Sequence, residues 1–421
     1  MARQTPVHPA SDAPARGNRW IALTTGTLAM TAGCTFQYGA VYLIPALRAE
    51  GMTLTEAGTL TAAPTAGLLL TLVAWGAAAD RWSERWIIAT GLGLAGTLLA
   101  LATQAHGTVP LGLCLLLAGA AGAAVHSASG RLVLGWFAPG RRGIAMGLRQ
   151  TAQPVGVAVG ALALPPLADA GRSRALLFLS VCCLAGAALV AVAARDPRRT
   201  AAGAARRPGS PYRTPTLWRV HASSALLIVP QFTVSAFSVV FLVDVHGWQA
   251  AAAGRAVAAG QLGGAVLRLV AGWWSDRAGS RMRPMRALTV AIALALAALA
   301  VCAAARSGTA VVVVVVAAVV SVSTNGLAYT TVAEYAGSGW AGKALGIQNT
   351  AQHVVATATP PLMATLISAT GYPAAFTVAA GSSLVAVATI PVRGEHRIDD
   401  SPPAPGAVAS EQGRGVVPTS K

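Results

Sequence analysis

Charged residues are scarce in this chain. Asp, Glu, Lys and Arg make up 11% of its 421 residues, whereas a soluble globular domain normally carries about 25%. Acidic residues are the rarer kind, at 14 against 31 basic ones, and hydrophobic residues reach 54%. The mean hydropathy is +0.59. This composition excludes a soluble globule and predicts a protein that lies in a lipid bilayer.

Lysine is almost absent, because only Lys343 and Lys421 occur among the 31 basic residues. The net charge of +17 does not predict a nucleic-acid partner. A nucleic-acid surface needs basic residues clustered on one face of a soluble domain, together with aromatic platforms. Here the basic residues fall in short breaks between apolar runs. We therefore expect no nucleic-acid partner.

The sequence also lacks the residue clusters that hold metals or carry out covalent catalysis. All five cysteines lie inside apolar runs without metal-ligand spacing, so we interpret them as small buried side chains. His126 and Ser127 are adjacent in sequence and cannot pair as residues one helical turn apart do. No His/Asp/Glu cluster is found along the chain. We expect no metal, no cofactor and no enzymatic activity.

Long apolar runs recur at roughly 20 residues, which is what one helix needs to cross a bilayer core of ~30 Å. The pattern predicts an all-α membrane protein with twelve transmembrane helices. The twelve expected spans cover residues 20–44, 54–79, 86–105, 110–136, 143–166, 174–194, 218–243, 251–274, 285–305, 309–333, 342–368 and 373–392.

Polar segments divide the twelve spans into two sets of six. Residues 1–19 hold Arg, Pro and Asp in place of the compact apolar core of a signal peptide, so we expect a cytoplasmic tail. Residues 20–195 are the expected N-terminal six-helix bundle and residues 218–392 the C-terminal one. Between them, residues 196–217 form a cytoplasmic linker rich in Arg, Pro, Gly and Ser. The polar, Pro-rich residues 393–421 are predicted to be a disordered cytoplasmic tail.

The orientation follows from the basic residues, because cytoplasmic loops retain positive charge. With the N-terminus inside, 23 of the 31 basic residues lie on the cytoplasmic side and five lie opposite. The remaining three fall within spans. We therefore predict a multi-pass protein of the plasma membrane with both termini in the cytoplasm.

One phrase occurs twice in the chain. Gly76-x-x-x-Asp80-Arg81 is followed 196 residues later by Gly272-x-x-x-Asp276-Arg277. Two further pairs of blocks keep the same order, at residues 143–153 and 342–352 and at the Pro-Pro-Leu of residues 165–167 and 360–362. The offsets of 195 to 199 residues indicate a parallel duplication of six helices.

The two repeated loops carry a resemblance to a known family. Gly76-x-x-x-Asp80-Arg81-x-x-x-Arg85 and its copy, which ends at Arg281, are similar to the signature loop of the major facilitator superfamily. The resemblance covers nearly everything between the two tails. It implies a secondary transporter in which two six-helix bundles enclose a central cavity and expose a small solute to one side of the membrane at a time.

The repeated loops are predicted to act as conformational latches. The two glycines leave room where helices pack closely, and Asp80 and Asp276 are placed to accept from the N-terminal amides of spans eleven and five. Arg131 and Glu334 are the expected ion-pair partners. The alternative is that the arginines are only retention charges. The predicted latch residues are Gly76, Asp80, Arg81, Arg85, Arg131, Gly272, Asp276, Arg277, Arg281 and Glu334.

Polar side chains near the middle of the spans mark the expected solute cavity, because burying them in hydrocarbon is costly. The alternative for each Gln or Asn is that it only joins neighbouring helices. For each histidine, the alternative is a hydrogen-bonded packing role. The candidate substrate-binding residues are Gln37, Tyr38, His126, Arg149, Gln150, Gln153, Gln231, Gln261, Arg268, Asn325, Tyr329, Asn349, Gln352 and His353.

Arg149 and Arg268 point to the chemistry of the solute. A guanidinium inside a membrane needs an anionic or carbonyl partner, and the middle of the spans contains no Asp or Glu. A missing counter-ion favours a carboxylate solute. Arg268 is similar in placement to the span-eight arginine of organic-anion carriers in the superfamily. Snorkelling to the surface or pairing with Asp80 or Asp276 is the alternative.

Two alternatives to the transport of a carboxylate remain open, a drug or metabolite efflux antiporter and a transporter-like membrane sensor without flux. A drug or metabolite efflux antiporter would usually carry a carboxylate in span one and a Gly-Pro pair in span five, and this chain has Gln153-Pro154 there. A transporter-like sensor would normally append a soluble domain, which the short tails do not provide. A coupling proton would have to be carried by His126, His353 or the solute. We expect the protein to function as a monomer.

Overall fold

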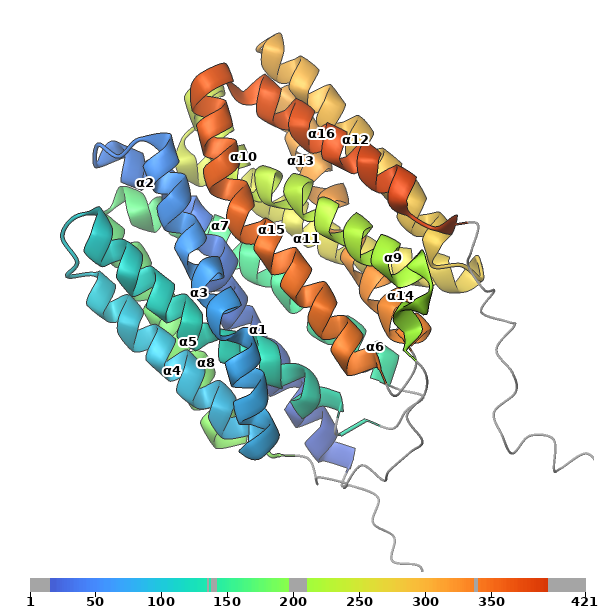
Figure 1. The fold of residues 1–421 in the computed structure, drawn as a ribbon. Helices are drawn as coiled ribbons and strands as arrows, with labels where there is room; N and C mark the ends of the chain where they lie inside the picture. Colours follow the sequence, from blue (N-terminus) through green and yellow to red (C-terminus); the bar gives the residue numbers. More distant parts are fainter. Residues whose placement is uncertain (1–15, 135, 138–141, 197–209, 337–339, 393–421) are drawn as a thin grey trace, which may run out of the picture.

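The computed structural model describes residues 16–134, 136–137, 142–196, 210–336 and 340–392. The described residues form twelve helical rods that fall into two groups of six (Figure 1). The first group runs from blue to green in Figure 1 and the second from lime to red. Each rod corresponds to one of the spans predicted from the sequence. The tails and most of the linker lie outside the described residues, so the predicted domain boundaries stay predictions.

The N-terminal group contains six rods, two of which are interrupted. The first rod combines α1 (Arg16–Gly39), the 3-10 helix η1 (Ala40–Leu43) and α2 (Ile44–Ala49), and the fifth combines α6 (Arg142–Gln150) and α7 (Ala152–Asp169). The continuous rods are α3 (Leu54–Arg81), α4 (Glu84–Ala102), α5 (Thr108–Leu134) and α8 (Arg172–Ala193).

The C-terminal group follows the short 3-10 helix η3 (Pro211–Arg213). Its first rod is divided into α9 (Pro215–Leu226) and α10 (Ile228–His246), and its fourth into α13 (Ala310–Ser321) and α14 (Asn325–Ala336). The continuous rods are α11 (Ala250–Arg277), α12 (Met282–Ala304), α15 (Ala341–Thr370) and α16 (Tyr372–Thr389).

The duplication is visible in the lengths of the helices. Both α3 and α11 contain 28 residues, and their first residues lie 196 positions apart, which is also the spacing of the repeated loops. The turn before each helix has a glycine with positive φ, Gly51 at 95° and Gly247 at 67°. The turn that leads into the second rod therefore has a similar backbone conformation in both halves.

Ten of the described helical segments are long and apolar enough to cross a membrane. The first rod and α15 are not among them. Both carry polar residues in their middle, such as Gln37 in α1 and Gln352 in α15. Such polar residues lower the hydropathy of these two rods below that of the other ten.

Small residues set how closely the rods approach one another. A Cβ atom added at Gly67 of α3 would lie 1.9 Å from the carbonyl oxygen of Leu116 in α5. Between the halves, a Cβ at Gly254 of α11 would lie 2.1 Å from the carbonyl oxygen of Ala161 in α7. A Cβ at Gly58 of α3 would lie 2.8 Å from Ala364 in α15. Backbones in contact at this distance are typical of packed transmembrane helices.

These contacts define two ends of the molecule. We call the end that carries residues 76–85 and 272–281 the repeat-loop end, and the end that carries Arg48 and Asp244 the far end. The close contacts of Gly58 and Gly254 lie toward the far end, where the halves touch. At Gly272 an added Cβ would meet no described atom within 4 Å. The predicted close packing at the two glycines of the repeated loops stays a prediction.

Candidate functional site

A cavity of about 1210 Å³ lies between the two halves. Its walls come from α1, α3, α5, α6 and α7 on one side and from α10, α11, α14 and α15 on the other. The lining reaches Gly76, Trp340 and Lys343, so the cavity extends to the repeat-loop end. A central cavity shared by both halves is the arrangement expected of a solute site at the middle of the membrane.

Most of the predicted substrate-binding residues line this cavity, and three do not. Gln37 donates to the backbone oxygen of Pro64, Gln261 donates to Ser235 at 3.2 Å, and Gln231 accepts from Asn325 at 3.0 Å. These three glutamines join helices within their own half. The predicted residues that line the cavity are Tyr38, His126, Arg149, Gln150, Gln153, Arg268, Asn325, Tyr329, Asn349, Gln352 and His353.

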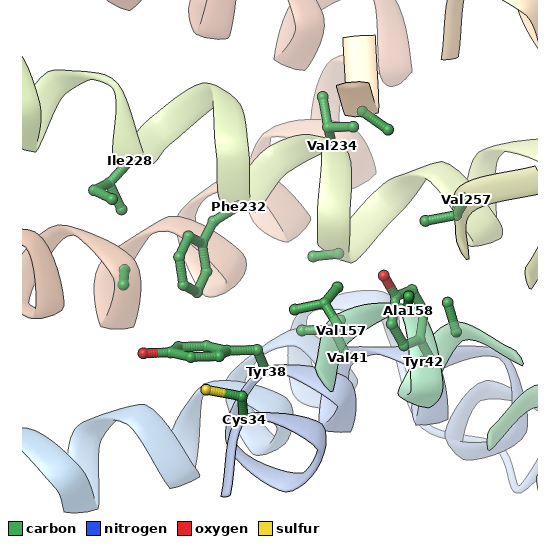
Figure 2. Close-up of a cluster of buried hydrophobic side chains, with 14 of the residues drawn as sticks. Cys34, Tyr38, Val41, Tyr42, Val157, Ala158, Ile228, Phe232, Val234 and Val257 are labelled. Carbon is green, nitrogen blue, oxygen red and sulfur yellow. The ribbon is translucent and has the colours of Figure 1, made fainter. Parts of the chain in front are cut away.

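Aromatic and imidazole rings from both halves meet at the inner part of the cavity. The Tyr38 hydroxyl lies 3.2 Å from Nε2 of His353, so α1 and α15 share a hydrogen bond across the halves. The Tyr38 ring is perpendicular to those of His126 and Phe232, at 6.0 and 5.7 Å between centroids. Figure 2 shows Tyr38 beneath Phe232, with Cys34 beside it. Phe232 was not predicted, because an apolar residue in an apolar span carries no sequence signal.

An amide cluster lines the C-terminal side of the cavity. The Tyr329 hydroxyl of α14 donates to Asn349 of α15 and lies 2.9 Å from Oε1 of Gln352. The side-chain nitrogen of Gln352 is buried and has no hydrogen-bond partner among the described residues. The same holds for Nε2 of His126 on the opposite wall. Both buried atoms are therefore left unsatisfied by described residues in this conformation.

Arg149 is held by neutral groups at the end of α6. Its Nε and Nη2 atoms lie 3.1 and 2.8 Å from the hydroxyl oxygen of Ser129 in α5. Nη2 also lies 3.5 Å from the carbonyl oxygen of His126. The side chain is buried at 7% exposure, yet it lines the cavity. No carboxylate among the described residues pairs with it.

Arg268 is also held by neutral groups, and all of them are backbone carbonyls. Nε and Nη2 lie 3.0 and 2.7 Å from the oxygen of Val322. Nη1 lies 2.8 Å from the oxygen of Gln150 in the other half. The expected alternative of pairing with Asp276 does not occur, because Asp276 contacts Arg281.

Comparison with known proteins gives the family. The model of the Major Facilitator Superfamily matches residues 22–360. The chain belongs to the major facilitator superfamily. It is 42% identical over 381 residues to an uncharacterized MFS-type transporter of Mycobacterium tuberculosis strain ATCC 25618 / H37Rv. A second such transporter, of M. tuberculosis strain CDC 1551 / Oshkosh, has the same identity. Both alignments cover 90% of this chain and 86% of the relative.

Solved structures of the superfamily share the fold. A bacterial homologue of the human lysosomal transporter Spinster matches with TM-scores of 0.66 and 0.67 in its inward-facing occupied and unoccupied structures. Each match covers 89% of this chain and 95% of the homologue, at 16% identity. The predicted all-α fold with two six-helix bundles is confirmed. The protein is a multi-pass membrane transporter of small molecules.

The C-terminal signature loop of this superfamily member is organised around Arg281. Its guanidinium pairs with Asp276 and, at 3.0 Å, with Glu334 of α14. Burial lowers the pKa of Arg281, but the hydrogen bonds to Glu334 and Asp276 outweigh burial and the pKa stands above its usual value. Glu334, which was predicted as a partner of this loop, therefore lies beside it. All three residues belong to one half, so a latch between the halves stays a prediction.

The N-terminal signature loop uses different partners. Arg85 donates to the carbonyl oxygen of Ala191, and its backbone amide lies 2.9 Å from Asp196. Ser83 also donates to Asp196. The side chains of Asp80 and Arg131 lie outside the part of the chain that the structure describes. Arg81 and Arg277 are exposed at the surface of this end.

The far end is closed by ion pairs that the sequence reasoning missed. Arg48 of α2 pairs with Asp244 of α10 across the halves, and the Tyr372 hydroxyl donates to the same carboxylate at 2.9 Å. Arg172 pairs with Glu50 at 2.6 Å within the N-terminal half. Together with the packing at Gly58 and Gly254, these contacts close the end opposite to the cavity mouth.

Proposed function

We propose that the protein is a secondary transporter that moves a small organic carboxylate by alternating access. In this proposal, the described conformation is open at the repeat-loop end and closed at the far end. Rocking of the two halves then separates Arg48 from Asp244 and brings the repeated loops together. The solute is released or captured on each side in turn.

The charge of the cavity is the observation that supports a carboxylate. Arg149, Arg268 and Lys343 all line it. None of its described lining residues is Asp or Glu. Cationic groups in a low-dielectric cavity without counter-charge attract an anion from solution. A carboxylate also matches the flat, two-pronged donor geometry of a guanidinium.

Arg149 is the proposed contact for the carboxylate. Its Nη1 atom makes no hydrogen bond with a described residue, while Nε and Nη2 are fixed on Ser129. One edge of the guanidinium is thus positioned by the protein and the other remains available. The side-chain nitrogen of Gln352 and Nε2 of His126 are buried without a partner among the described residues. They would bind further polar atoms of the solute once neighbouring side chains move.

The distribution of tryptophan supports a cytoplasmic repeat-loop end. Six tryptophans are exposed, and all of them lie at this end: Trp20, Trp82, Trp86, Trp218, Trp273 and Trp274. Three of them lie beneath guanidinium groups: Arg277 lies 4.3 Å from the Trp273 ring, Arg85 lies 4.9 Å from the Trp86 ring and Arg19 lies 5.7 Å from the Trp20 ring. Tryptophans gather at the level of lipid headgroups, and basic residues on the cytoplasmic side.

Flux measurements in reconstituted vesicles test the proposed function. A panel of labelled carboxylates would be compared with their neutral amides, which keep the shape and lose the charge. We expect flux of at least one carboxylate and much slower flux of its amide. Arg149→Gln should raise KM for the carboxylate about tenfold or more, whereas Arg255→Gln, an exposed arginine of α11, should leave it unchanged.

Two outcomes would contradict the proposal. Equal flux of acid and amide would show that charge is not recognised and would favour a carrier of neutral or cationic compounds, such as an efflux antiporter. An absence of flux for every solute, in vesicles that hold folded protein, would favour a sensor.

A further inference from the structure

Pro154 leaves one backbone carbonyl of the fifth rod without its usual donor. In an α-helix, the oxygen of residue i accepts from the amide of residue i+4. The residue four positions after Gln150 is Pro154, which has no N–H. The rod also breaks there, because α6 ends at Gln150 and α7 begins at Ala152. The carbonyl of Gln150 therefore needs a donor from outside its own helix.

The tenth rod has a comparable break. Helix α13 ends at Ser321 and α14 begins at Asn325, with non-helical residues between them. The carbonyl of Val322 lies in this break, where the regular ladder of helix hydrogen bonds is interrupted. Because the break lies inside a membrane-spanning rod, its polar backbone must be satisfied by protein.

A single side chain satisfies both carbonyls. Arg268 donates through Nη1 to Gln150 at 2.8 Å and through Nε and Nη2 to Val322 at 3.0 and 2.7 Å. It is 6% exposed. Gly326 makes room for its stem, because a Cβ there would lie 3.3 Å from Cγ of Arg268.

We propose that Arg268 is a positioning residue that joins the two halves through these broken helices, and that it does not bind the solute. We call Arg268 with the carbonyls of Gln150 and Val322 the cross-half tie. Each of its three nitrogen atoms already donates to a carbonyl, in contrast to Arg149. The tie connects α11 and α13–α14 of one half to α6–α7 of the other. This proposal rests on the proposed function only where it gives the tie a role in the movement of the two halves during transport.

Pro154→Ala tests the tie without touching arginine. Alanine supplies the missing N–H, so the carbonyl of Gln150 gains a donor within its own helix and needs Arg268 less. Pro166→Ala is the matched control, because it makes the same change in α7 at an exposed position. Arg268→Met removes the donors directly, and Arg255→Met is its control on the same helix.

Hydrogen exchange of the full-length protein in lipid nanodiscs, without any solute, is the first measurement. Arg268→Met should accelerate exchange about tenfold or more in peptides that cover residues 148–156 and in those that cover 320–328. Arg255→Met should accelerate neither. Pro154→Ala should slow exchange in the first region only. Unchanged exchange in both regions of Arg268→Met would overturn the tie, whatever the outcome of the flux assays.

A double-mutant cycle on the unfolding temperature is the second measurement. If Arg268 acts through the carbonyl that Pro154 exposes, the effects of Arg268→Met and Pro154→Ala will not add. The effects of Arg268→Met and Pro166→Ala will add. Additive effects in both pairs would contradict the tie.

Transport kinetics separate a positioning role from solute binding. With a carboxylate identified by the flux panel, Arg268→Met should lower Vmax about tenfold and change KM less than twofold. Arg268→Lys should recover only part of Vmax, because one ammonium cannot reach both carbonyls in the same way. A large rise in KM with unchanged Vmax would instead identify Arg268 as a solute ligand. If the panel finds no solute, exchange and unfolding still decide the inference.

Discussion

Arg48 and Asp244 occupy equivalent positions in the two repeats and pair with each other. They are 196 residues apart, which is the spacing of Gly76 and Gly272 and of the first residues of α3 and α11. Equivalent residues of two related halves come together only where the pseudo-twofold axis passes between them. One duplicated position therefore supplies both partners of the ion pair that closes the far end.

A charge exchange tests this closure. Arg48→Asp places two carboxylates at the axis and should shift the protein toward a conformation open at the far end. The side chains are 37% and 31% exposed, so the pair contributes about 0.2–1 kcal/mol, or at most roughly fivefold in the equilibrium. Combining Arg48→Asp with Asp244→Arg should restore the original distribution. Distances between spin labels across the far end would measure the fraction of open and closed molecules. If the combined variant is open as often as the single variant, the ion pair does not hold the far end closed.

Tyr38→Phe removes the hydrogen bond that crosses the cavity to His353. The ring and its contacts with Phe232 remain, so folding should be preserved. Loss of one hydrogen bond costs about 0.5–1.5 kcal/mol, and we expect flux of the carboxylate to fall roughly threefold to tenfold. Tyr42→Phe, whose hydroxyl has no hydrogen-bond partner among the described residues, is the control and should transport normally.

Ser129→Ala should loosen Arg149 without removing its charge. Ser129 accepts two hydrogen bonds from the guanidinium, so its loss lets the arginine turn away from the productive orientation. We expect KM for the carboxylate to rise, by less than it does in Arg149→Gln. Initial rates over a range of solute concentrations would check this order. A larger effect of Ser129→Ala than of Arg149→Gln would show that the serine has a role of its own.

Two glycines should respond oppositely to alanine. At Gly67 of α3 a Cβ would lie 1.9 Å from a backbone oxygen, and such overpacking costs about 1–3 kcal/mol. At Gly272 of α11 a Cβ would meet no described atom within 4 Å, so Gly272→Ala should unfold at the same or a higher temperature. Its flux should nevertheless fall, because closing the repeat-loop end requires the helices to approach there. Normal flux in Gly272→Ala would show that the loops stay apart throughout the cycle.

The sequence predicted the fold better than it predicted which groups each polar side chain contacts. Duplicated motifs and apolar runs specify twelve spans, and polar residues within spans locate the helices around the cavity. The same polarity cannot tell a cavity residue from one that joins helices, which is why Gln37, Gln231 and Gln261 lie elsewhere. A pattern of side chains also does not reveal backbone acceptors, so the partners of Arg268 were missed, although Pro154 marks one of them.

Predicting the ion pair at the far end would also have required a position-by-position comparison of the two repeats. Arg48 and Asp244 look like ordinary loop charges when each is considered alone. Their common offset becomes informative only when it is combined with the position of the axis. Phe232 could be predicted neither from polarity within its span nor from the comparison of the repeats.

The pairing of Arg48 with Asp244 also bears on how such a chain arose. Two identical six-helix subunits around the same axis would place arginine against arginine, or aspartate against aspartate, and would repel at the far end. The attractive pair requires two unlike copies. It therefore dates from after the duplication, when the two copies could diverge, and it records an interaction that no symmetric ancestral dimer could have made.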